Sequence, residues 1–482
     1  MPESLVRLLR TFVLRTNPHW PFRYCNRIPY AAALRVFVRC FKTRPEIRSI
    51  YVRHGLAQGE WIPALSDIDL TLVLRRDLPV ELEYDFLETF WRRYGRLRRI
   101  FPMLGEVLIL NQDEFALWLT SSSYSPVNRR WHLLHGEQSV CLRADGSEHW
   151  RRRALSYALW MHLETLPPCF SEPDSFLRRQ DIQRRARKIL RLLQPILAEA
   201  GQPQLPIERT PDPVEILTDV LRSFETAVTH VASIEPRDDI PEPMGPHPTV
   251  RDGCEFLSTP IPGAEGIWSV ILRPDHTALF LIEDGLERKA IRRLVQASQH
   301  AWPGVQSTPI LLHRCLFTYL IRHDNPFHYS SLLRRRTIAF GTDPLTKIDP
   351  PGRAAFVGHT LDRIANILTF TRSEELLETA TPLSVSALET SLNRALAVRL
   401  LLGSDWISPH PHENAARRRS AFPECFRALE EIKGHSAAGR EEAARRASFQ
   451  LFRSLASEVR DLMSHADREG RLAGAAGGRI GD

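Results

Sequence analysis

The chain has 482 residues, which is too long for a single hydrophobic core, so we expect about two to four domains. A composition of 43% hydrophobic and 25% charged residues is ordinary for a soluble protein and predicts a stable fold. The net charge of +7, carried largely by short arginine clusters, favours anionic partners such as a nucleoside triphosphate or nucleic acid, although solvated helix faces carry such clusters too.

Cysteine usage and apolar segments bound the environment of the protein. The seven cysteines have no Cys-x-x-Cys or other paired spacing, which predicts reduced thiols and no zinc site. The first ten residues carry arginines inside an apolar run and lack a small-residue cleavage site. No later segment reaches the length of a membrane span. We therefore expect a cytoplasmic protein with no membrane partner.

The N-terminal third contains the most informative pattern. After a helix and an aromatic, proline-broken segment in residues 1–30, a second helix is predicted for 31–42. An apolar strand from Ile50 then leads into a loop with glycines, and a second strand opens with Asp67 and Asp69. Because side chains alternate along a strand, these two carboxylates should share one face while apolar residues occupy the other.

Paired carboxylates beside a glycine loop suit magnesium and phosphate. Two acids held side by side repel each other unless a hard cation neutralises them, and oxygen ligands of this kind suit Mg²⁺, which often completes its shell with substrate phosphates. At Gly55 and Gly59 the backbone can approach a ligand closely, so that main-chain N–H groups can meet phosphate oxygens. The pattern predicts metal and phosphate in one cleft.

A third acid follows at the expected place. A helix is predicted for 80–97, and the short apolar strand 103–110 carries one acid, Glu106, near its start. If the third acid joins the pair, it would complete a carboxylate cluster. The alternative is that Asp67 and Asp69 form a solvated strand end and that Glu106 is an ordinary edge acid.

Together these segments resemble the polymerase-β-type nucleotidyltransferase superfamily, and the Gly55 to Asp67 spacing and the run 66–70 are most similar to its minimal and antibiotic-modifying members. The resemblance implies an α/β (α+β) domain with a small mixed sheet. There is one departure, because Leu56 stands where the family has Gly or Ser, so a hydroxyl that would touch the triphosphate is missing.

The resemblance also implies the chemistry. Asp67, Asp69 and Glu106 would be the catalytic and metal-binding residues, with two Mg²⁺ ions per site, and Gly55, Leu56 and Ser66 would contact the nucleotide. A nucleoside monophosphate would pass from a triphosphate such as ATP to an acceptor hydroxyl, with release of pyrophosphate. The acceptor, whether a small molecule, a protein or RNA, is left open.

The remaining chain suggests further domains. After a catalytic domain at 1–145, we predict a helical bundle at 146–233, a proline-rich linker at 234–248, a small α/β region of unknown role at 249–350, a helical C-terminal domain at 351–466 and a disordered tail at 467–482. Within the fourth segment, residues 268–272 and 277–282 flank a turn and predict a hairpin.

Two alternatives stay open. Leu56 is also consistent with a catalytically degenerate domain that binds a nucleotide, RNA or a partner protein. Arg460 and His465 have the Arg-x4-His spacing of HEPN-type ribonucleases, which often accompany minimal nucleotidyltransferases in toxin or defence systems, but so arginine-rich a chain produces that spacing easily by chance.

Overall fold

The computed structural model describes most of the chain. The described residues are 3–59, 61–121, 131–138, 150–165, 176–202, 212–234, 254–256, 265–272, 278–298, 310–326, 328–329, 332, 336–351, 355, 359, 367–377, 389, 392–393, 396, 416 and 418–468. The predicted linker and tail lie outside these ranges apart from their first one or two residues. Within the described ranges, no helix has both the length and the apolar character needed to cross a membrane.

The chain folds into two compact units. Unit 1 comprises residues 1–122, 127–145 and 360–472, and unit 2 comprises 123–126, 146–359 and 473–482. Unit 1 thus combines the predicted catalytic domain with most of the predicted C-terminal helical domain. Unit 2 combines the predicted bundle with the predicted α/β region.

Unit 1 contains one sheet and helices from both ends of the chain. Its strands are β1 (Ile47–Val52), β2 (Ile68–Leu74), β3 (Leu104–Asn111) and β4 (His132–Gly136). Its N-terminal helices are α1 (Glu3–Thr16), α2 (Phe22–Cys25), α3 (Ile28–Phe41), α4 (His54–Gln58), α5 (Val80–Ile100) and α6 (Gln112–Ser121). Its C-terminal helices include α14 (Glu374–Leu377), α17 (Pro423–Ala437) and α18 (Glu441–Arg468).

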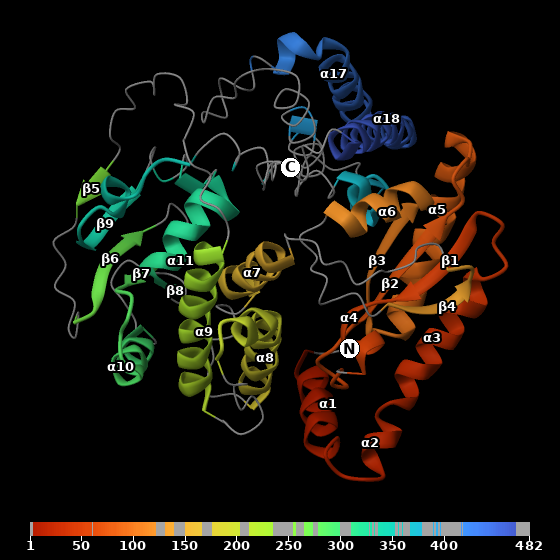
Figure 1. Cartoon of the computed structure of the whole chain (residues 1–482). Coiled ribbons are helices and arrows are strands. Elements are labelled where there is room, and N and C mark those ends of the chain that lie inside the picture. The colour runs from red at the N-terminus through yellow and green to blue at the C-terminus, as the bar shows by residue number, and fades with distance from the viewer. Residues whose placement is uncertain are drawn as a thin grey trace, which may run out of the picture. The chain divides into compact units, whose positions relative to one another are not determined.

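The first sheet has the order β3-β2-β1-β4 and is mixed (Figure 1). β1 runs antiparallel to β2 and β4, whereas β3 runs parallel to β2. The apolar period of α3 and α5 brings Phe37, Phe41 and Phe90 together in an aromatic core. On another side, Tyr51 of β1 packs on Phe115 of α6. Every residue of β2 after Asp69 is buried, so side chains on both faces of this strand are covered and neither face is open to solvent there.

Unit 2 carries a second sheet beside a three-helix bundle. Its strands are β5 (Cys254–Phe256), β6 (Ile267–Leu272), β7 (Ala278–Ile282), β8 (Ile310–His313) and β9 (Arg336–Gly341). Its helices are α7 (Trp150–Trp160), continued by a π-helix (Met161–Thr165), α8 (Phe176–Glu199), α9 (Pro213–Ile234), α10 (Arg288–Ser298) and α11 (Arg314–Tyr319), followed by a second π-helix (Leu320–Asp324) and a 3₁₀ turn (Pro344–Lys347). The antiparallel pairing of β6 with β7 confirms the predicted hairpin.

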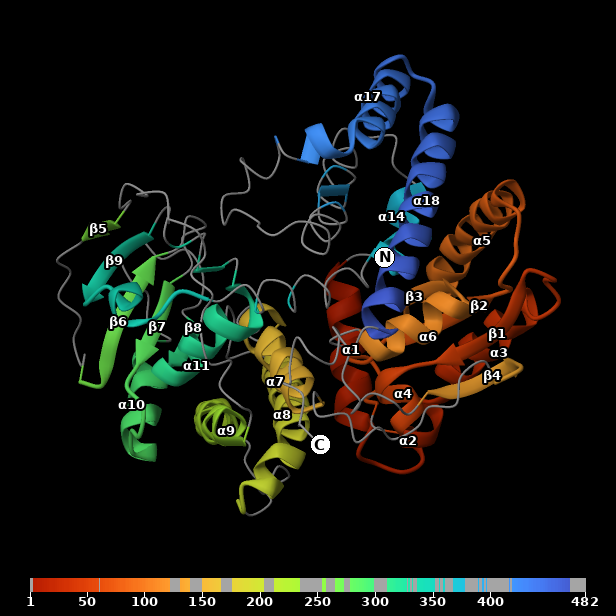
Figure 2. The same ribbon diagram turned by 45° about the horizontal axis from the view of Figure 1, so that its top comes forward.

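The second sheet repeats the strand order of the first. Read from β8, its order is β8-β7-β6-β9, with β5 added at the edge (Figure 2). Each neighbouring pair also has the same sense as its counterpart: β7 and β8 are parallel, and β6 is antiparallel to β7 and β9. The corresponding strands β4 and β9 each end in a glycine with a positive φ. Gly136 lies opposite Ser49 and Gly341 opposite Ser269, and a Cβ at these two positions would lie 2.0 and 2.2 Å from a neighbouring carbonyl oxygen.

In each unit, a long helix packs on the two helices that flank the third strand. α18 contacts α5 and α6 in unit 1, and α9 contacts α10 and α11 in unit 2. In sequence, however, α9 follows the first sheet and α18 follows the second. The long helix of each unit therefore lies, along the chain, after the sheet of the other unit.

A network of buried charged side chains links the C-terminal segment of unit 1 to helices α5 and α6. Arg372, which has no exposed surface, pairs with Glu83 of α5 and with Glu114 of α6, both of which are buried. Arg453 of α18 lies 2.9 Å from the other oxygen of Glu83, and the indole of Trp91 donates to the Arg372 carbonyl at 3.0 Å. Each buried charge thus has an opposite partner, which is the condition for tolerating it.

We predict that Arg372→Met destabilises the protein by about 3–5 kcal/mol, because it leaves two buried carboxylates without their shared cation. Urea unfolding followed by circular dichroism measures the loss. Arg92→Met is the matched control, because Arg92 pairs with Glu88 at the surface and should cost less than about 1 kcal/mol. Equal losses in the two variants would contradict the role given to Arg372.

Candidate functional site

The predicted acids lie at one end of the first sheet, in a row that crosses three strands. Arg53 directly follows β1, and its amide donates to the Asp69 carbonyl at 2.8 Å. In the parallel pairing of β2 with β3, Leu70 faces Val107, so Asp69 and Glu106 are the preceding residues on neighbouring strands. The Glu106 amide donates to Asp69 Oδ1 at 3.3 Å. The structure therefore brings Glu106 beside Asp69, as the sequence pattern predicted.

Arg53 is the residue that sequence reasoning missed. Its guanidinium is fully buried, and it donates through Nε to the Leu70 carbonyl at 3.2 Å and through Nη2 to Glu106 Oε2 at 3.0 Å. A strand-end arginine next to a glycine loop was available as a signal, because a buried cation requires an acid partner and the nearest acids are those of the cluster.

Asp69 is an acid of the cluster whose pKa is raised by its surroundings. Burial raises the pKa of Asp69, and the charges of Glu106 and Asp67 raise it further, whereas Arg53 and the Glu106 amide lower it. The net direction is upward, so the ionised form of Asp69 is disfavoured by its surroundings. Asp67 immediately precedes β2 and is exposed to solvent.

Gly105 makes this close approach of the strands feasible. A Cβ built on Gly105 would lie 2.8 Å from the Asp67 Cβ and 2.8 Å from Asp69 Oδ1. Any larger residue would push the edge strand or the carboxylates aside. Gly105 is the second residue that the sequence pattern did not single out, although a glycine directly before the third acid was visible.

The predicted phosphate loop has a defined conformation. Gly55 and Leu56 lie in the five-residue helix α4, whose first residue, His54 (φ 55°), and C-cap, Gly59 (φ 73°), are left-handed. Gly55 itself is helical, which differs from the expectation that it forms a turn. Ser66 closes the following loop, because its Oγ accepts from the Ile62 amide at 2.9 Å.

The acid cluster fits a divalent cation by its charge and donor chemistry. The three carboxylates and Arg53 leave two negative charges at one sheet end, and carboxylate oxygens are the ligands that Mg²⁺ prefers. The oxygens of all three acids do not lie within 4.8 Å of one another. A single ion held by all three would require Glu106, whose side chain is 57% exposed, to rotate away from Arg53.

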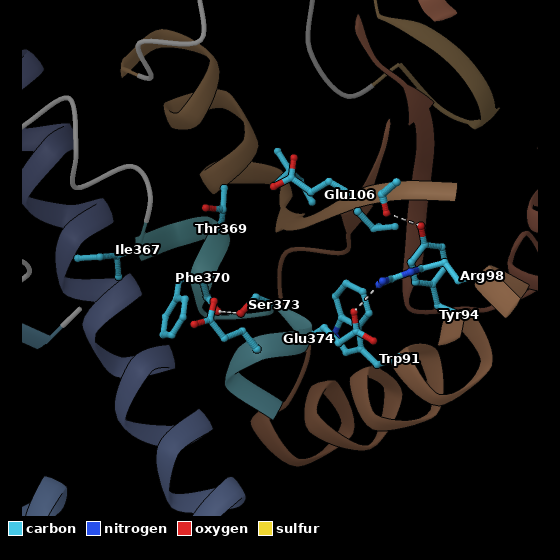
Figure 3. A pocket seen from close by; sticks show the side chains of 13 residues that line it. Trp91, Tyr94, Arg98, Glu106, Ile367, Thr369, Phe370, Ser373 and Glu374 are labelled. Carbon is cyan, nitrogen blue, oxygen red and sulfur yellow. Dashed lines mark hydrogen bonds and ion pairs between the residues drawn. The ribbon is translucent and has the colours of Figure 1, made fainter. Parts of the chain in front are cut away.

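A cavity of about 480 Å³ adjoins the edge strand β3 (Figure 3). Tyr94, Arg98 and Glu106 line one side, and Ile367, Thr369 and Phe370 from the C-terminal segment line the other. Arg98 pairs with Glu374 at 2.9 Å, and both residues line the cavity. Glu106 therefore belongs to the acid row and also lines this cavity, which is large enough for a small organic group.

In the sequence, the second sheet has no acid at the position that corresponds to Asp69. Val52 pairs with Leu70 in the first sheet, and Leu272 pairs with Ala278 at the equivalent place in the second. Asp69 precedes Leu70 in the sequence, whereas Thr277 precedes Ala278. In the last helix, Arg460 bonds Ser457 at 3.1 Å, and the side chain of His465 lies outside the described residues. The Arg460 and His465 hypothesis stays a prediction.

Comparisons with known proteins add no relative. No protein-family model, no curated protein and no solved structure matches the chain.

We predict that Asp69→Asn raises the Tm of the protein in EDTA at pH 8. The folded-state pKa of Asp69 is raised, so its carboxylate destabilises the fold above that pKa, and the gain should shrink as the pH falls toward the ordinary aspartate value of about 3.9. The asparagine side chain keeps an oxygen that can accept from the Glu106 amide. Differential scanning calorimetry measures the effect against Asp77→Asn, an exposed aspartate beyond β2. A lower Tm for Asp69→Asn at pH 8 would contradict this electrostatic reading.

Proposed function

We propose that the protein is a Mg²⁺-dependent nucleotidyltransferase that transfers a nucleoside monophosphate from a nucleoside triphosphate to an acceptor hydroxyl. The observation that carries the proposal is the juxtaposition of Asp69 with Glu106, across parallel strands and beside Asp67. Asp69, whose pKa is raised by burial and by the neighbouring carboxylates, is unfavourable when ionised, and acids with perturbed pKa values of this kind cluster at functional sites.

Asp67 and Asp69 would hold the metal, and Glu106 would complete the set or act as a base. When bound, Mg²⁺ supplies positive charge that neutralises the phosphates and favours departure of pyrophosphate. The acceptor oxygen attacks the α-phosphorus, the bond to the β-phosphate oxygen breaks, and Glu106 takes the acceptor's proton. The amides that follow His54 in α4 would contact the triphosphate, since Gly55 has no side chain to block their approach.

The charge balance bears on the number of ions. Three carboxylates offset by Arg53 leave two negative charges, which match one divalent cation. A nucleoside triphosphate brings its own negative charge and would bring the second Mg²⁺ with it. The expectation of two ions per site would therefore apply to the nucleotide complex.

The cavity beside β3 is the place that we assign to the acceptor. Glu106 lies on its wall, so a hydroxyl bound there would be near the proposed base. The wall combines aromatic and charged side chains, namely Trp91, Tyr94, Arg98 and Glu374. This lining suits a polar organic acceptor with a ring or an acidic group.

The proposal is tested by label transfer. The purified protein is incubated with each α-labelled triphosphate, Mg²⁺ and three acceptor classes: the protein itself, a short RNA and a panel of polyhydroxylated amines. We expect Mg²⁺-dependent transfer with pyrophosphate release. It should fall about 10³-fold in Asp69→Asn, because the metal contributes several kcal/mol to the transition state, and about 10²–10⁴-fold in Glu106→Gln. Asp77→Asn should retain full activity.

Equal pyrophosphate release by the wild type and by the double variant Asp67→Asn plus Asp69→Asn would dispose of the proposed mechanism. A second candidate, nucleotide binding without transfer, is favoured by one observation, which is that Arg53 already pairs with Glu106. Under that alternative, the protein binds the triphosphate with Mg²⁺, no acceptor is labelled, and Glu106→Gln leaves the affinity unchanged.

A further inference from the structure

A second group of metal-binding side chains lies in unit 2. Among the described residues, the donor atoms of Glu225, Asp284 and His313 all lie within 4.8 Å of one another. Glu225 belongs to α9, Asp284 follows β7, and His313 ends β8. The group therefore joins the helical bundle to the second sheet, and it lies at the end of β7 opposite to the end that corresponds to the acid row.

The imidazole of His313 is oriented as in a metal ligand. The ring is fully buried, and its Nδ1 lies 3.3 Å from the Glu283 carbonyl oxygen, which can only accept a hydrogen bond. With the proton on Nδ1, the neutral ring presents a bare lone pair at Nε2. That atom is buried, has no hydrogen-bond partner and lies 3.7 Å from Glu225 Oε2. Metal-binding histidines commonly donate their other N–H to a carbonyl in this way.

A lone pair that faces a carboxylate is electrostatically unfavourable, and a cation between the two relieves the repulsion. A proton is one such cation, but a charged N–H···O bond spans about 2.7–2.9 Å, well short of the 3.7 Å observed. Two ligands of one tetrahedral ion, each about 2.1 Å from it, lie roughly 3.4 Å apart. Burial also lowers the pKa of His313, although Glu225 and Asp284 oppose that change.

The equivalent place in unit 1 shows what the cluster replaces. Asn111 ends β3 opposite Leu74, as His313 ends β8 opposite Ile282. The side chain of Asn111 accepts from the Glu114 amide, whereas His313 makes no such cap. Two residues beyond Leu74, Arg76 supplies a positive charge that pairs with Asp113. Two residues beyond Ile282, unit 2 has Asp284, so an acid stands in unit 2 where unit 1 has a cation.

We propose that Glu225, Asp284 and His313 bind a divalent transition-metal ion of the zinc class through His313 Nε2 and one oxygen from each acid. One imidazole and two carboxylates suit zinc better than magnesium and leave a position for water. The ion can enter from solvent, since the Asp284 side chain is 41% exposed. Cysteine spacing gave no sign of the site because its donors are nitrogen and oxygen atoms, separated by tens of residues.

Zinc binding to the full-length protein tests this proposal. The protein is stripped with EDTA and dialysed, and Zn²⁺ is titrated in competition with a fluorescent chelator, with metal content checked by mass spectrometry. We expect one tightly bound Zn²⁺ per chain and a Tm that rises with Zn²⁺. Glu225→Gln and His313→Asn should each weaken binding by more than the about 10–100-fold that follows loss of an outer-sphere partner.

Two controls locate the ion. Asp77→Asn, at an exposed aspartate of unit 1, and His132→Asn, at an exposed residue of β4, should bind Zn²⁺ as the wild type does. Glu225→Gln keeps the hydrogen-bonding shape of a partly exposed side chain, so it reports on binding even if His313→Asn fails to fold. Wild-type affinity in a folded Glu225→Gln variant, or no bound Zn²⁺ in the wild type, would overturn the proposal. Neither result depends on nucleotidyltransfer.

Discussion

The feature on which the site depends is the row of charges that crosses β1, β2 and β3. Parallel pairing of β2 with β3 sets Glu106 beside Asp69, and Gly105 allows the approach because a Cβ there would collide with both aspartates. Arg53, buried beneath the row, supplies one positive charge against three negative ones. What remains is a sheet end with surplus negative charge, held by a rigid backbone. Surplus negative charge of this kind is unfavourable unless cations neutralise it, and this is the basis of the proposed metal site.

The two units repeat one arrangement and diverge in their charges. Both sheets share strand order and sense, and both have a long helix on the pair of helices that flank the third strand. Only the first copy carries the acid pair at the start of its second strand. At the opposite end of that strand the relation is reversed, since the first copy pairs Arg76 with Asp113, while the second gathers Asp284, Glu225 and His313. The long helix of each unit follows the sheet of the other unit in sequence, and in unit 1 the buried Arg372 links the C-terminal segment to α5 and α6.

Short-range patterns in the sequence predicted the local elements well. Alternation and helical periodicity located the strands that carry Asp69 and Glu106, the helix between them and the hairpin of β6 and β7. The apolar stretch 309–322 has no period that separates strand from helix, and it contains both, as β8 and α11. What the sequence could not supply are contacts between distant segments. Arg372 meets Glu83 from 289 residues away, and Arg53 meets Glu106 from 53. Neither contact can be predicted from a period of 2 or 3.6 residues. The similarity of the two sheets lies in their strand order and sense, and no sequence motif reveals it.

The most direct test of the central claim is to locate the ion itself. Crystals of the wild type grown with Mn²⁺ and a non-hydrolysable triphosphate, with data collected at the manganese absorption edge, would reveal the metal as an anomalous peak. The account predicts a peak in contact with the carboxylates of Asp67 and Asp69, with the triphosphate beside α4, and its loss in Asp69→Asn. A nucleotide bound elsewhere, or Asp67 and Asp69 with no peak between them in the presence of both ligands, would contradict it.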